Sequence, residues 1–414
     1  MNPKDINGIS HERRRLIGSL GALGAAAFVA PLVATAARSD VIELPFAGGE
    51  RPLTSDFPQK SHVILQRTRP PILETPFDVF DQGVFTPNDR FYVRWHLANI
   101  PTLIDPASYR LNIRGHVNKT LALTLRDLVY RYPRFQIAAV NQCSGNSRGL
   151  FSPRVPGGQW GNGGMGNAIW TGVRLKDVLD HAGVRAHAVQ ARFTGLDTGV
   201  VAQTPQFMKS LDIEHARDGE VMLAYAMNGA ALPLLNGYPL RLVVPGWYAT
   251  YWVKMLHDIE VLDRPDDNFW TAKAYRIPDN PLANVRPGAT DLRQVPINRM
   301  LPRSFFTNLR SGATLNAGQS TLVRGIAFGG INALKNVQLS TNGGQTWAAT
   351  QLGRDYGKYS FRQWQTVISY PQRGKQVLMV RAVDSTGQAQ PNVPNWNGAG
   401  FMRNVSEAIQ VEVV

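Results

Sequence analysis

A single cysteine, Cys143, is the feature that most constrains this chain of 414 residues. A lone thiol cannot form an internal disulfide, a CxxC redox pair, a cysteine-based zinc site or a CxxCH haem attachment. The fold therefore cannot rest on disulfides or on a cysteine-held zinc ion. Cys143 itself can be a small buried hydrophobe, a nucleophile, or a single thiolate ligand of a metal that is held mainly by something else.

The residues around Cys143 favour a site. An apolar run, 135–140, leads into the cysteine, and a polar loop with Gly145 and Gly149 follows it. We expect a strand that delivers the cysteine side chain to a site at its end, because a cysteine used only for packing needs no such loop. Six glycines then lie within residues 157–166, around Trp160. Glycine lets backbone N–H groups approach a ligand, so this stretch fits the wall of a cleft as well as a long surface turn.

The composition predicts a β-rich globular fold. The chain has 38 glycines, 27 prolines and few long helical periods. With 43% apolar and 18% charged residues, it is long enough for two domains. Helices are expected at 125–130 and at 175–181, the second with Gly183 suited to its C-cap. Short strands are expected at 91–97, 109–117, 135–141, 190–194, 221–227 and 240–244.

The character of the sequence changes near Pro287. Before it, the first domain is expected to span 41–288, with the proline-rich segment 41–88 as an irregular arm lying over it. Beyond it, 289–414 is typical of strands alone, and the Asn342-Gly343 pair between two alternating runs is a strong hairpin signal. The spacing of these strands indicates a β-sandwich.

Residues 1–36 are typical of an export signal. Three arginines, 13–15, precede an Ala/Gly-rich apolar stretch with no charge until Arg38, and Ala34-Thr35-Ala36 offers a cleavage site. A paired arginine before such a run is the twin-arginine type of signal, which carries folded proteins, so we expect the mature chain in the periplasm. The alternative is an uncleaved membrane anchor, since the run is near spanning length. No segment after the signal is expected to span a membrane.

The net charge of +14 falls to +12 without residues 1–36, because that segment holds four basic and two acidic side chains. Such a field attracts anionic substrates or an acidic protein partner. The arginines are scattered and form no lysine-rich stripe or known binding motif, which argues against nucleic acid as a partner.

The predicted strand 91–97 combines an apolar face with a cationic one. Period-two alternation puts Tyr92, Arg94 and His96 on one face, with Arg94 and His96 about 7 Å apart. A guanidinium fork beside an imidazole suits an anion pocket, although a solvated face opposite a core face gives the same pattern. The opposite face is apolar: Phe91, Val93, Trp95 and Leu97.

Five stretches follow one another in a fixed order: Phe-Tyr-Val-Arg-Trp-His-Leu at 91–97, Asn-Gln-Cys-Ser-Gly-Asn-Ser-Arg at 141–148, Gly-Leu-Asp at 195–197, Tyr238 to Gly246, and Trp-Val-Lys at 252–254. Together they resemble the sulfite oxidase family of molybdenum enzymes, and the resemblance spans roughly residues 75–410. The nearest branch is that of the bacterial sulfite dehydrogenases, which pass electrons to a separate cytochrome c. The resemblance implies an α+β, β-rich fold, in which a mixed molybdopterin-binding domain precedes an immunoglobulin-like β-sandwich that often pairs subunits.

The resemblance also implies a role for each matching residue. Cys143 matches the cysteine whose thiolate binds molybdenum beside a pterin dithiolene. The residues that match the surroundings of the oxyanion pocket are Arg94, Arg148, Trp160 and Tyr275. The cofactor would be molybdenum–molybdopterin, and the reaction would be the oxidation of sulfite to sulfate. The positions matching contacts to the cofactor are Tyr92, Val93, Arg94, Trp95, His96, Cys143, Asp197, Asn236, Arg241, Trp252, Val253 and Lys254.

Two departures from the family pattern affect these expectations. Asn236 stands where the animal enzymes carry histidine, so the pterin contacts at this position are open. No b-type haem domain precedes the molybdenum domain, and the chain cannot attach a c-type haem. Electrons are therefore expected to leave to a separate c-type cytochrome, with the chain as a homodimer or as a heterodimer with the cytochrome subunit.

Several other functions fit parts of the same pattern. Within the superfamily these are a sulfane dehydrogenase and a periplasmic methionine-sulfoxide reductase, although the reductase lacks the C-terminal sandwich and Arg148 favours a doubly cationic sulfite pocket. A cysteine hydrolase could pair Cys143 with His96 or His257. A secreted binding module with an immunoglobulin-like tail would need no metal at all.

Overall fold

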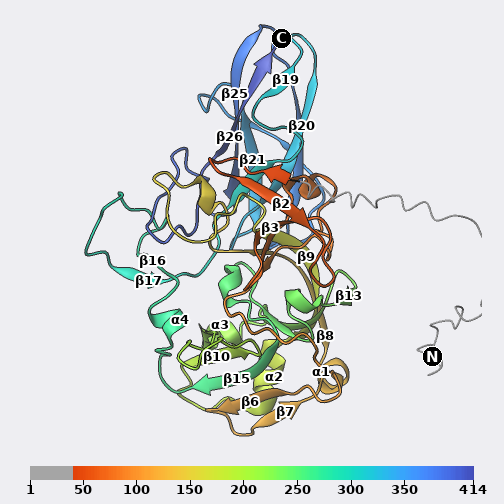
Figure 1. Cartoon of the computed structure of the whole chain (residues 1–414), viewed down its shortest axis with the longest axis vertical. Coiled ribbons are helices and arrows are strands. Elements are labelled where there is room, and N and C mark those ends of the chain that lie inside the picture. Colours follow the sequence, from red (N-terminus) through yellow and green to blue (C-terminus); the bar gives the residue numbers. More distant parts are fainter. Residues whose placement is uncertain (1–40) are drawn as a thin grey trace, which may run out of the picture. The chain divides into compact units, whose positions relative to one another are not determined.

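The computed structural model describes residues 41–414, so the predicted export signal, 1–36, lies outside the described residues. Strands predominate over short helices throughout this range (Figure 1). The β-rich α+β fold expected from the composition is thereby confirmed. Among the described residues, no helix is both long and apolar enough to cross a membrane.

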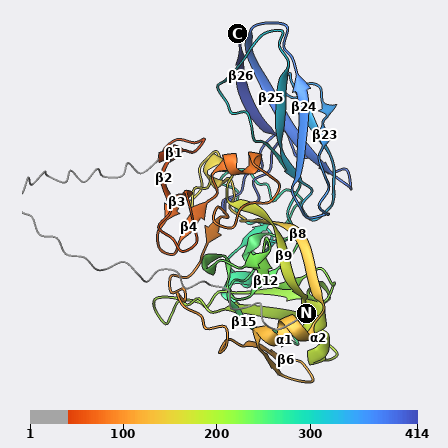
Figure 2. The same cartoon turned by 90° about the vertical axis from the view of Figure 1, so that its right-hand side faces the viewer.

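The segment 41–88 forms a sheet, so the expectation of an irregular arm was wrong. Most of its prolines lie between strands, where they end pairing without preventing it. A 3₁₀ helix, Phe77–Asp81, follows the fourth strand. The strands pair antiparallel in sequence order: β1 (Val41–Glu43), β2 (Glu50–Thr54), β3 (Val63–Arg67), β4 (Ile72–Glu74) and β5 (Val93–Arg94). The first four lie side by side in Figure 2.

A second sheet has the strand order β11-β10-β15-β6-β7. Its helix α1 (Leu125–Arg131) begins with a capping box, because Thr124 and Asp127 each accept a backbone N–H of the other. The short helices α3 (Ile213–Ala216) and α4 (Phe269–Ala272) follow β11 and β15. The strands are β6 (Leu111–Gly115), β7 (Leu121–Leu123), β10 (Gln190–Gly195), β11 (Met208–Asp212) and β15 (Leu256–Leu262).

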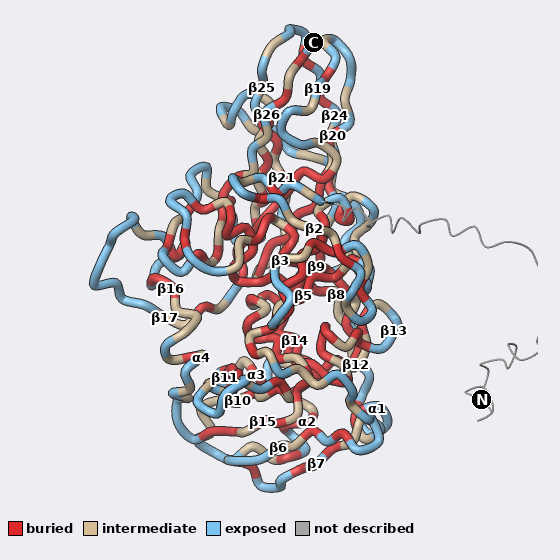
Figure 3. Tube along the Cα trace, viewed as in Figure 1, coloured by how far each residue is buried: buried red, intermediate tan, exposed pale blue. Residues whose placement is uncertain are grey.

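A third sheet carries the strand that leads to Cys143. β9 and β14 are buried along nearly their whole length (Figure 3). Helix α2 (Leu175–Ala182) follows β9 and ends at Gly183, whose left-handed φ of +69° confirms the expected C-cap. The strands of this third sheet are β8 (Arg134–Gln142), β9 (Met165–Arg174), β12 (Met222–Met227), β13 (Ala230–Ala231) and β14 (Arg241–Val243).

Shorter elements connect these sheets to the C-terminal part. Strands β16 (Arg276–Pro278) and β17 (Gln294–Pro296) pair with each other. Three single-turn 3₁₀ helices are assigned within residues 41–414 besides Phe77–Asp81, and they all lie close to predicted site residues: Arg148–Leu150, Leu234–Asn236 and Ala249–Tyr251.

The C-terminal residues form the predicted β-sandwich. One sheet has the order β18-β20-β24-β23, and the other β19-β26-β25-β21-β22. Val323, Trp364 and Leu378 belong to the core between them. The Asn342-Gly343 hairpin is confirmed between β21 and β22. The strands are β18 (Arg303–Phe306), β19 (Ala313–Leu315), β20 (Thr321–Phe328), β21 (Leu334–Ser340), β22 (Ala348–Ala349), β23 (Gln351–Leu352), β24 (Arg362–Ile368), β25 (Gly374–Asp384) and β26 (Glu407–Val413).

The sandwich packs directly against the N-terminal half. The Phe77 and Phe305 rings meet edge to face with 5.5 Å between their centroids, inside a core that both parts share. Beside them, Arg324 on β20 forms a bidentate pair with Asp81, with Nε 2.8 Å from Oδ1. Side chains of the sandwich can therefore reach the loops of the preceding sheets.

Candidate active site

A cavity lies where the ends of several elements meet, and together with its opening to solvent it encloses about 490 Å³ of empty space. Its lining comes from β5, the end of β8, two 3₁₀ helices and the segment after α4, which are far apart in the sequence. Most of the predicted site residues line it: Tyr92, Val93, Arg94, His96, Cys143, Asn236, Arg241, Trp252, Lys254 and Tyr275.

Cys143 directly follows the last residue of β8, as the apolar run before it predicts. The β8–β9 register ends with Gln142 opposite Met165, and Cys143 N donates to Gly164 O at 2.9 Å. The side chain is 8% exposed and lines the cavity. The hairpin thus fixes the backbone on the N-terminal side of the cysteine and leaves the thiol facing the cavity.

β5 supplies the cationic face predicted for 91–97. Only Val93 and Arg94 pair as a strand, because β5 is a sheet edge whose pairing partner, β4, is itself short. The alternation nevertheless continues, since Arg94 and His96 are half-buried at the cavity while Trp95 is buried. Tyr92 lines the same cavity, although it is buried.

The cavity is strongly cationic. Arg241 is buried between the Trp170 and Trp252 rings, 4.8 and 5.6 Å from their centroids, and burial lowers its pKa to about 10. Lys254 donates to Arg94 O at 3.0 Å, and burial, reinforced by the charge of Arg241, lowers its pKa. These side chains together with Arg94 favour an anion in the cavity.

His96 and Tyr275 form a hydrogen-bonded pair at the cavity wall. Burial lowers the pKa of His96 well below its usual value, and the nearby Arg94 lowers it further. Burial raises the pKa of Tyr275. At neutral pH the imidazole is therefore uncharged and the phenol protonated, so the resting pair carries no net charge.

Tyr275 is held in place by ring stacking. Its ring stacks on that of Phe401 at 5.2 Å and 10°, and Phe401 belongs to a loop that follows the sandwich strand β25. Its φ of +55° is unusual for a residue other than glycine, so the surrounding contacts must hold this backbone.

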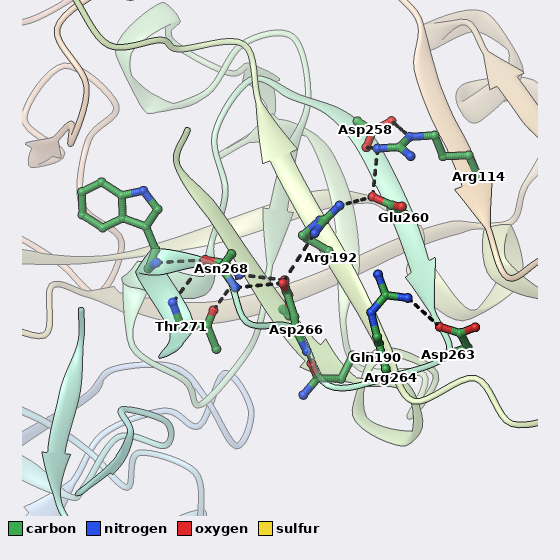
Figure 4. A network of polar contacts seen from close by, with 12 residues as sticks. Arg114, Gln190, Arg192, Asp258, Glu260, Asp263, Arg264, Asp266, Asn268 and Thr271 are labelled. Carbon is green, nitrogen blue, oxygen red and sulfur yellow. Dashed lines mark hydrogen bonds and ion pairs between the residues drawn. The ribbon is translucent and has the colours of Figure 1, made fainter. Parts of the chain in front are cut away.

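A polar network fixes helix α4, which precedes Tyr275 (Figure 4). The Asn268 side chain caps the helix by accepting from Trp270 N and Thr271 N, and it donates to Asp266 at 2.7 Å. Asp266 also contacts Arg192 of β10, so the helix is connected to the second sheet.

Five predicted residues lie outside the cavity lining. Trp95 and Trp160 are buried behind it, and Trp160 meets the Tyr92 ring edge to face. Burial raises the pKa of the Asp197 carboxyl, and Lys254 opposes that rise. The other two are Val253, which is buried, and Arg148.

Arg148 fits into a space made by glycines. A Cβ at Gly145 would come within 2.5 Å of its guanidinium, and one at Gly400 within 2.7 Å of its Nε. The guanidinium lies over the Phe401 ring at 5.2 Å and donates to the carbonyls of Gly158 and Ala399. In this structure Arg148 therefore stands behind the cavity wall.

Two family models match the chain. Residues 96–270 match the oxidoreductase molybdopterin binding domain, and residues 296–413 match the Mo-co oxidoreductase dimerisation domain. The mitochondrial sulfite oxidase of Rattus norvegicus is 31% identical over 88% of this chain and 68% of its own length. That of Homo sapiens is 33% identical over 83% and 65%, so the chain spans about two thirds of these mammalian relatives.

The chain belongs to the sulfite oxidase family of molybdopterin oxidoreductases. The crystal structure of the sulfane dehydrogenase SoxCD from Paracoccus pantotrophus has the same fold, with a TM-score of 0.70 and 24% identity over 94% of this chain and 93% of that one. The family resemblance and the molybdenum–molybdopterin cofactor expected from the sequence are confirmed.

The cavity of this family member fits that cofactor. Within residues 41–414, some buried side-chain nitrogens of the cavity lining have no hydrogen-bond partner: Arg94 Nη1, Asn141 Nδ2 and Arg241 Nε. Such donors are costly unless an acceptor meets them, and the pterin and its phosphate are rich in acceptors. Cys143 is the thiolate available in the same cavity, and thiolate is a soft donor suited to molybdenum.

Sequence reasoning missed residues that lie outside the cavity lining but contact the lining residues and hold them in place. Lys60 donates to Asn236 Oδ1 at 2.5 Å and to Phe91 O at 2.9 Å, and Asn236 Nδ2 donates to Tyr92 O at 3.0 Å. The Asn236 amide is therefore used within the protein, where it holds the strand before Arg94. Phe401 was missed as well, because nothing in its local sequence marks it as a neighbour of Tyr275.

Proposed function

We propose that this chain oxidises sulfite to sulfate and passes the electrons to a separate c-type cytochrome. One observation carries the proposal: the chain's only cysteine shares a cavity with the cationic side chains of Arg94, Arg241 and Lys254. The similarity to sulfite oxidases supports sulfite as the substrate.

The position of each residue in the cavity suggests its role. The bound cofactor supplies the two-electron redox chemistry. Cys143 would hold the metal through its thiolate, while the buried Arg241 and the half-buried Lys254 would bind the cofactor's acceptor groups. Arg94 is left to bind the sulfite oxyanion, because a guanidinium fork can donate two charge-assisted hydrogen bonds to it.

The His96–Tyr275 pair handles protons. Converting sulfite and water to sulfate releases two protons and two electrons. The uncharged His96 can accept a proton, and Tyr275, hydrogen-bonded to it, can pass one on. The electrons leave one at a time to the cytochrome. The protons leave by a separate route, through the His96–Tyr275 pair.

The test is a substrate comparison on the molybdenum-loaded enzyme. Molybdenum content is measured first, and then reduction of cytochrome c is followed with sulfite and, separately, with a sulfane-sulfur substrate. We expect about one molybdenum per chain and cytochrome reduction that depends on sulfite. Reduction with the sulfane substrate alone would replace sulfite with sulfane as the substrate class, and a protein without molybdenum would end the proposal.

The electron acceptor is proposed to dock electrostatically. The mature charge of +12 should attract an acidic face of the cytochrome, and attraction between surface charges chiefly raises the association rate. The cytochrome-dependent rate should therefore fall as salt rises, since the Debye length is about 10 Å at 0.1 M. The rate with an uncharged artificial acceptor should fall much less, and equal salt dependence would assign the effect to sulfite binding instead.

We further propose that the chain works in the periplasm and pairs through its sandwich. The pair Arg13-Arg14 before an apolar stretch supports export, and the match of 296–413 to a dimerisation domain supports a homodimer. Replacing Arg13 and Arg14 by lysine should leave precursor in the cytoplasm, and normal export of that variant would refute the twin-arginine route. Light scattering of the purified protein tests the dimer.

A further inference from the structure

A buried arginine of the sandwich reaches the cysteine loop. Arg303 is the first residue of β18 and is 2% exposed, yet it lies about 160 positions from the residues that it contacts. Its Nη1 donates to Ser147 Oγ at 3.1 Å and to Gln142 Oε1 at 3.4 Å. These two residues flank Cys143, so one guanidinium holds the loop on both sides of the thiol.

The two side chains that Arg303 contacts make further hydrogen bonds within the loop and to the glycine-rich stretch. Gln142 Oε1 also accepts from Asn146 Nδ2 at 3.2 Å, which closes the loop upon itself. Ser147 Oγ donates to Asn162 Oδ1 at 2.6 Å, which joins the loop to the glycine-rich stretch before β9. Because Ser147 has a left-handed φ of +67°, its backbone needs such contacts to remain in place.

The other end of the guanidinium is anchored within the sandwich. Its Nη2 pairs with Glu407 Oε1 at 2.7 Å, and the Phe305 ring lies 4.4 Å from the guanidinium carbon. Glu407 compensates a charge that would otherwise be buried alone. Arg303 lies outside the cavity lining, so it acts on the site only through the loop.

We propose that Arg303 is the positioning residue that fixes the Cys143 loop, and that the sandwich thereby completes the active site. Its effect on catalysis rests on the proposed role of Cys143, whereas its hold on the loop does not. Without Arg303 the loop should open more often, and the thiol should be exposed or displaced more often.

The single cysteine gives a direct probe of this loop. The full-length protein is treated with iodoacetamide under native conditions in both its loaded and its cofactor-free form, because a thiolate bound to the metal would be shielded from the reagent. Alkylation of Cys143 is followed by mass spectrometry. Arg303→Met leaves Glu407 paired with Arg403 at 3.3 Å, so no carboxylate is left without a cation. We expect its alkylation rate to rise about 10-fold, since a charged hydrogen-bond donor to the loop is lost. Ser147→Ala, which removes one acceptor in the loop, should raise the rate by a smaller factor.

A matched variant separates loop positioning from general loosening. The control is Arg324→Met, which removes the bidentate pair with Asp81, another link between the sandwich and the N-terminal half. This variant should alkylate within about twofold of the wild-type rate, because it removes no contact to the loop.

Sulfite kinetics add a second readout. Since Arg303 does not line the cavity, Arg303→Met should lose kcat with little change in KM. Wild-type alkylation in both Arg303→Met and Ser147→Ala, or equal acceleration in Arg324→Met, would overturn the positioning role. If the enzyme proved inactive with sulfite while the alkylation rates followed the expected order, the proposed function would fail and the positioning role would stand.

Discussion

Replacing Arg241 by methionine should change the stability of the cofactor-free and the loaded protein in opposite directions. Arg241 is 3% exposed, and within residues 41–414 no carboxylate pairs with it. Its hydrogen bonds go to two carbonyls, with Nη1 2.8 Å from Asn236 O and Nη2 3.4 Å from Trp252 O. Its Nε is buried without a partner. The cofactor-free protein thus carries an uncompensated buried cation.

The structure sets the size of each change. Burial lowers the pKa of Arg241 from 12.5 to about 10. That fall corresponds to about 3 kcal/mol of cost for the charged form. Methionine removes this cost but loses the two carbonyl contacts, worth about 2 kcal/mol together. The cofactor-free variant should therefore be more stable by about 1 kcal/mol. The loaded variant should lose about 2–4 kcal/mol of cofactor binding, since a buried charge-assisted partner is gone.

The assay compares thermal unfolding of both forms with molybdenum retention after gel filtration. Arg174→Met is the matched control, because Arg174 also lies on an aromatic ring, that of Phe135, and donates to a carbonyl, but outside the cavity. It should leave molybdenum content unchanged. Full molybdenum retention in Arg241→Met, or a lower melting temperature of its cofactor-free form, would refute the reasoning that the unpaired cation serves the cofactor.

Three further variants test two residues of the site and one buried lysine, Lys209, outside the cavity lining. Cys143→Ser should lose nearly all sulfite oxidation at an unchanged melting temperature, because a hydroxyl is a harder donor than a thiolate; activity within a few-fold of wild type would remove the cysteine from the mechanism. Arg94→Met should lose about 2–4 kcal/mol of transition-state binding, measured at fixed salt as a fall in kcat/KM for sulfite. An unchanged kcat/KM would place the oxyanion elsewhere. Burial lowers the pKa of Lys209 to about 7, against 10.5 unfolded. The unfolded state therefore holds more protons between these values, and stability should rise by about 2 kcal/mol from pH 7 to 9. Lys209→Met should flatten that rise in urea titrations, whereas an unchanged slope would assign it to other groups.

Local sequence patterns predicted the structure correctly where a single strand determines the position of a side chain. The apolar run 135–140 predicted the strand that ends at Cys143, and the observed β8 extends it by one residue before and two after. Alternation alone placed Arg94 and His96 on one face. Both predictions use only neighbours in the chain, and the pleat of a strand fixes the direction of those side chains.

The predictions that failed, and the residues that were missed, involve contacts between residues distant in sequence. Segment 41–88 was expected to be irregular, yet β4 pairs with β5 some twenty residues later and so has a sheet to join. Lys60 reaches Asn236 across 176 positions, and Phe401 stacks on Tyr275 from the sandwich side. A lysine or phenylalanine in a loop has no local signature of such a contact, since tertiary packing decides it.

Two of the buried arginines in the described residues differ in their partners. Arg303 and Arg241 are almost equally buried, at 2% and 3% exposure. Arg303 has its carboxylate, Glu407, within the protein, as a structural charge requires. Arg241 has carbonyls and tryptophan rings but, in the described chain, no counter-charge. Because Arg241 lines the cavity and Arg303 does not, we infer that Arg241 binds an anionic ligand there, and the phosphate of the sulfite oxidase family's cofactor is such a group.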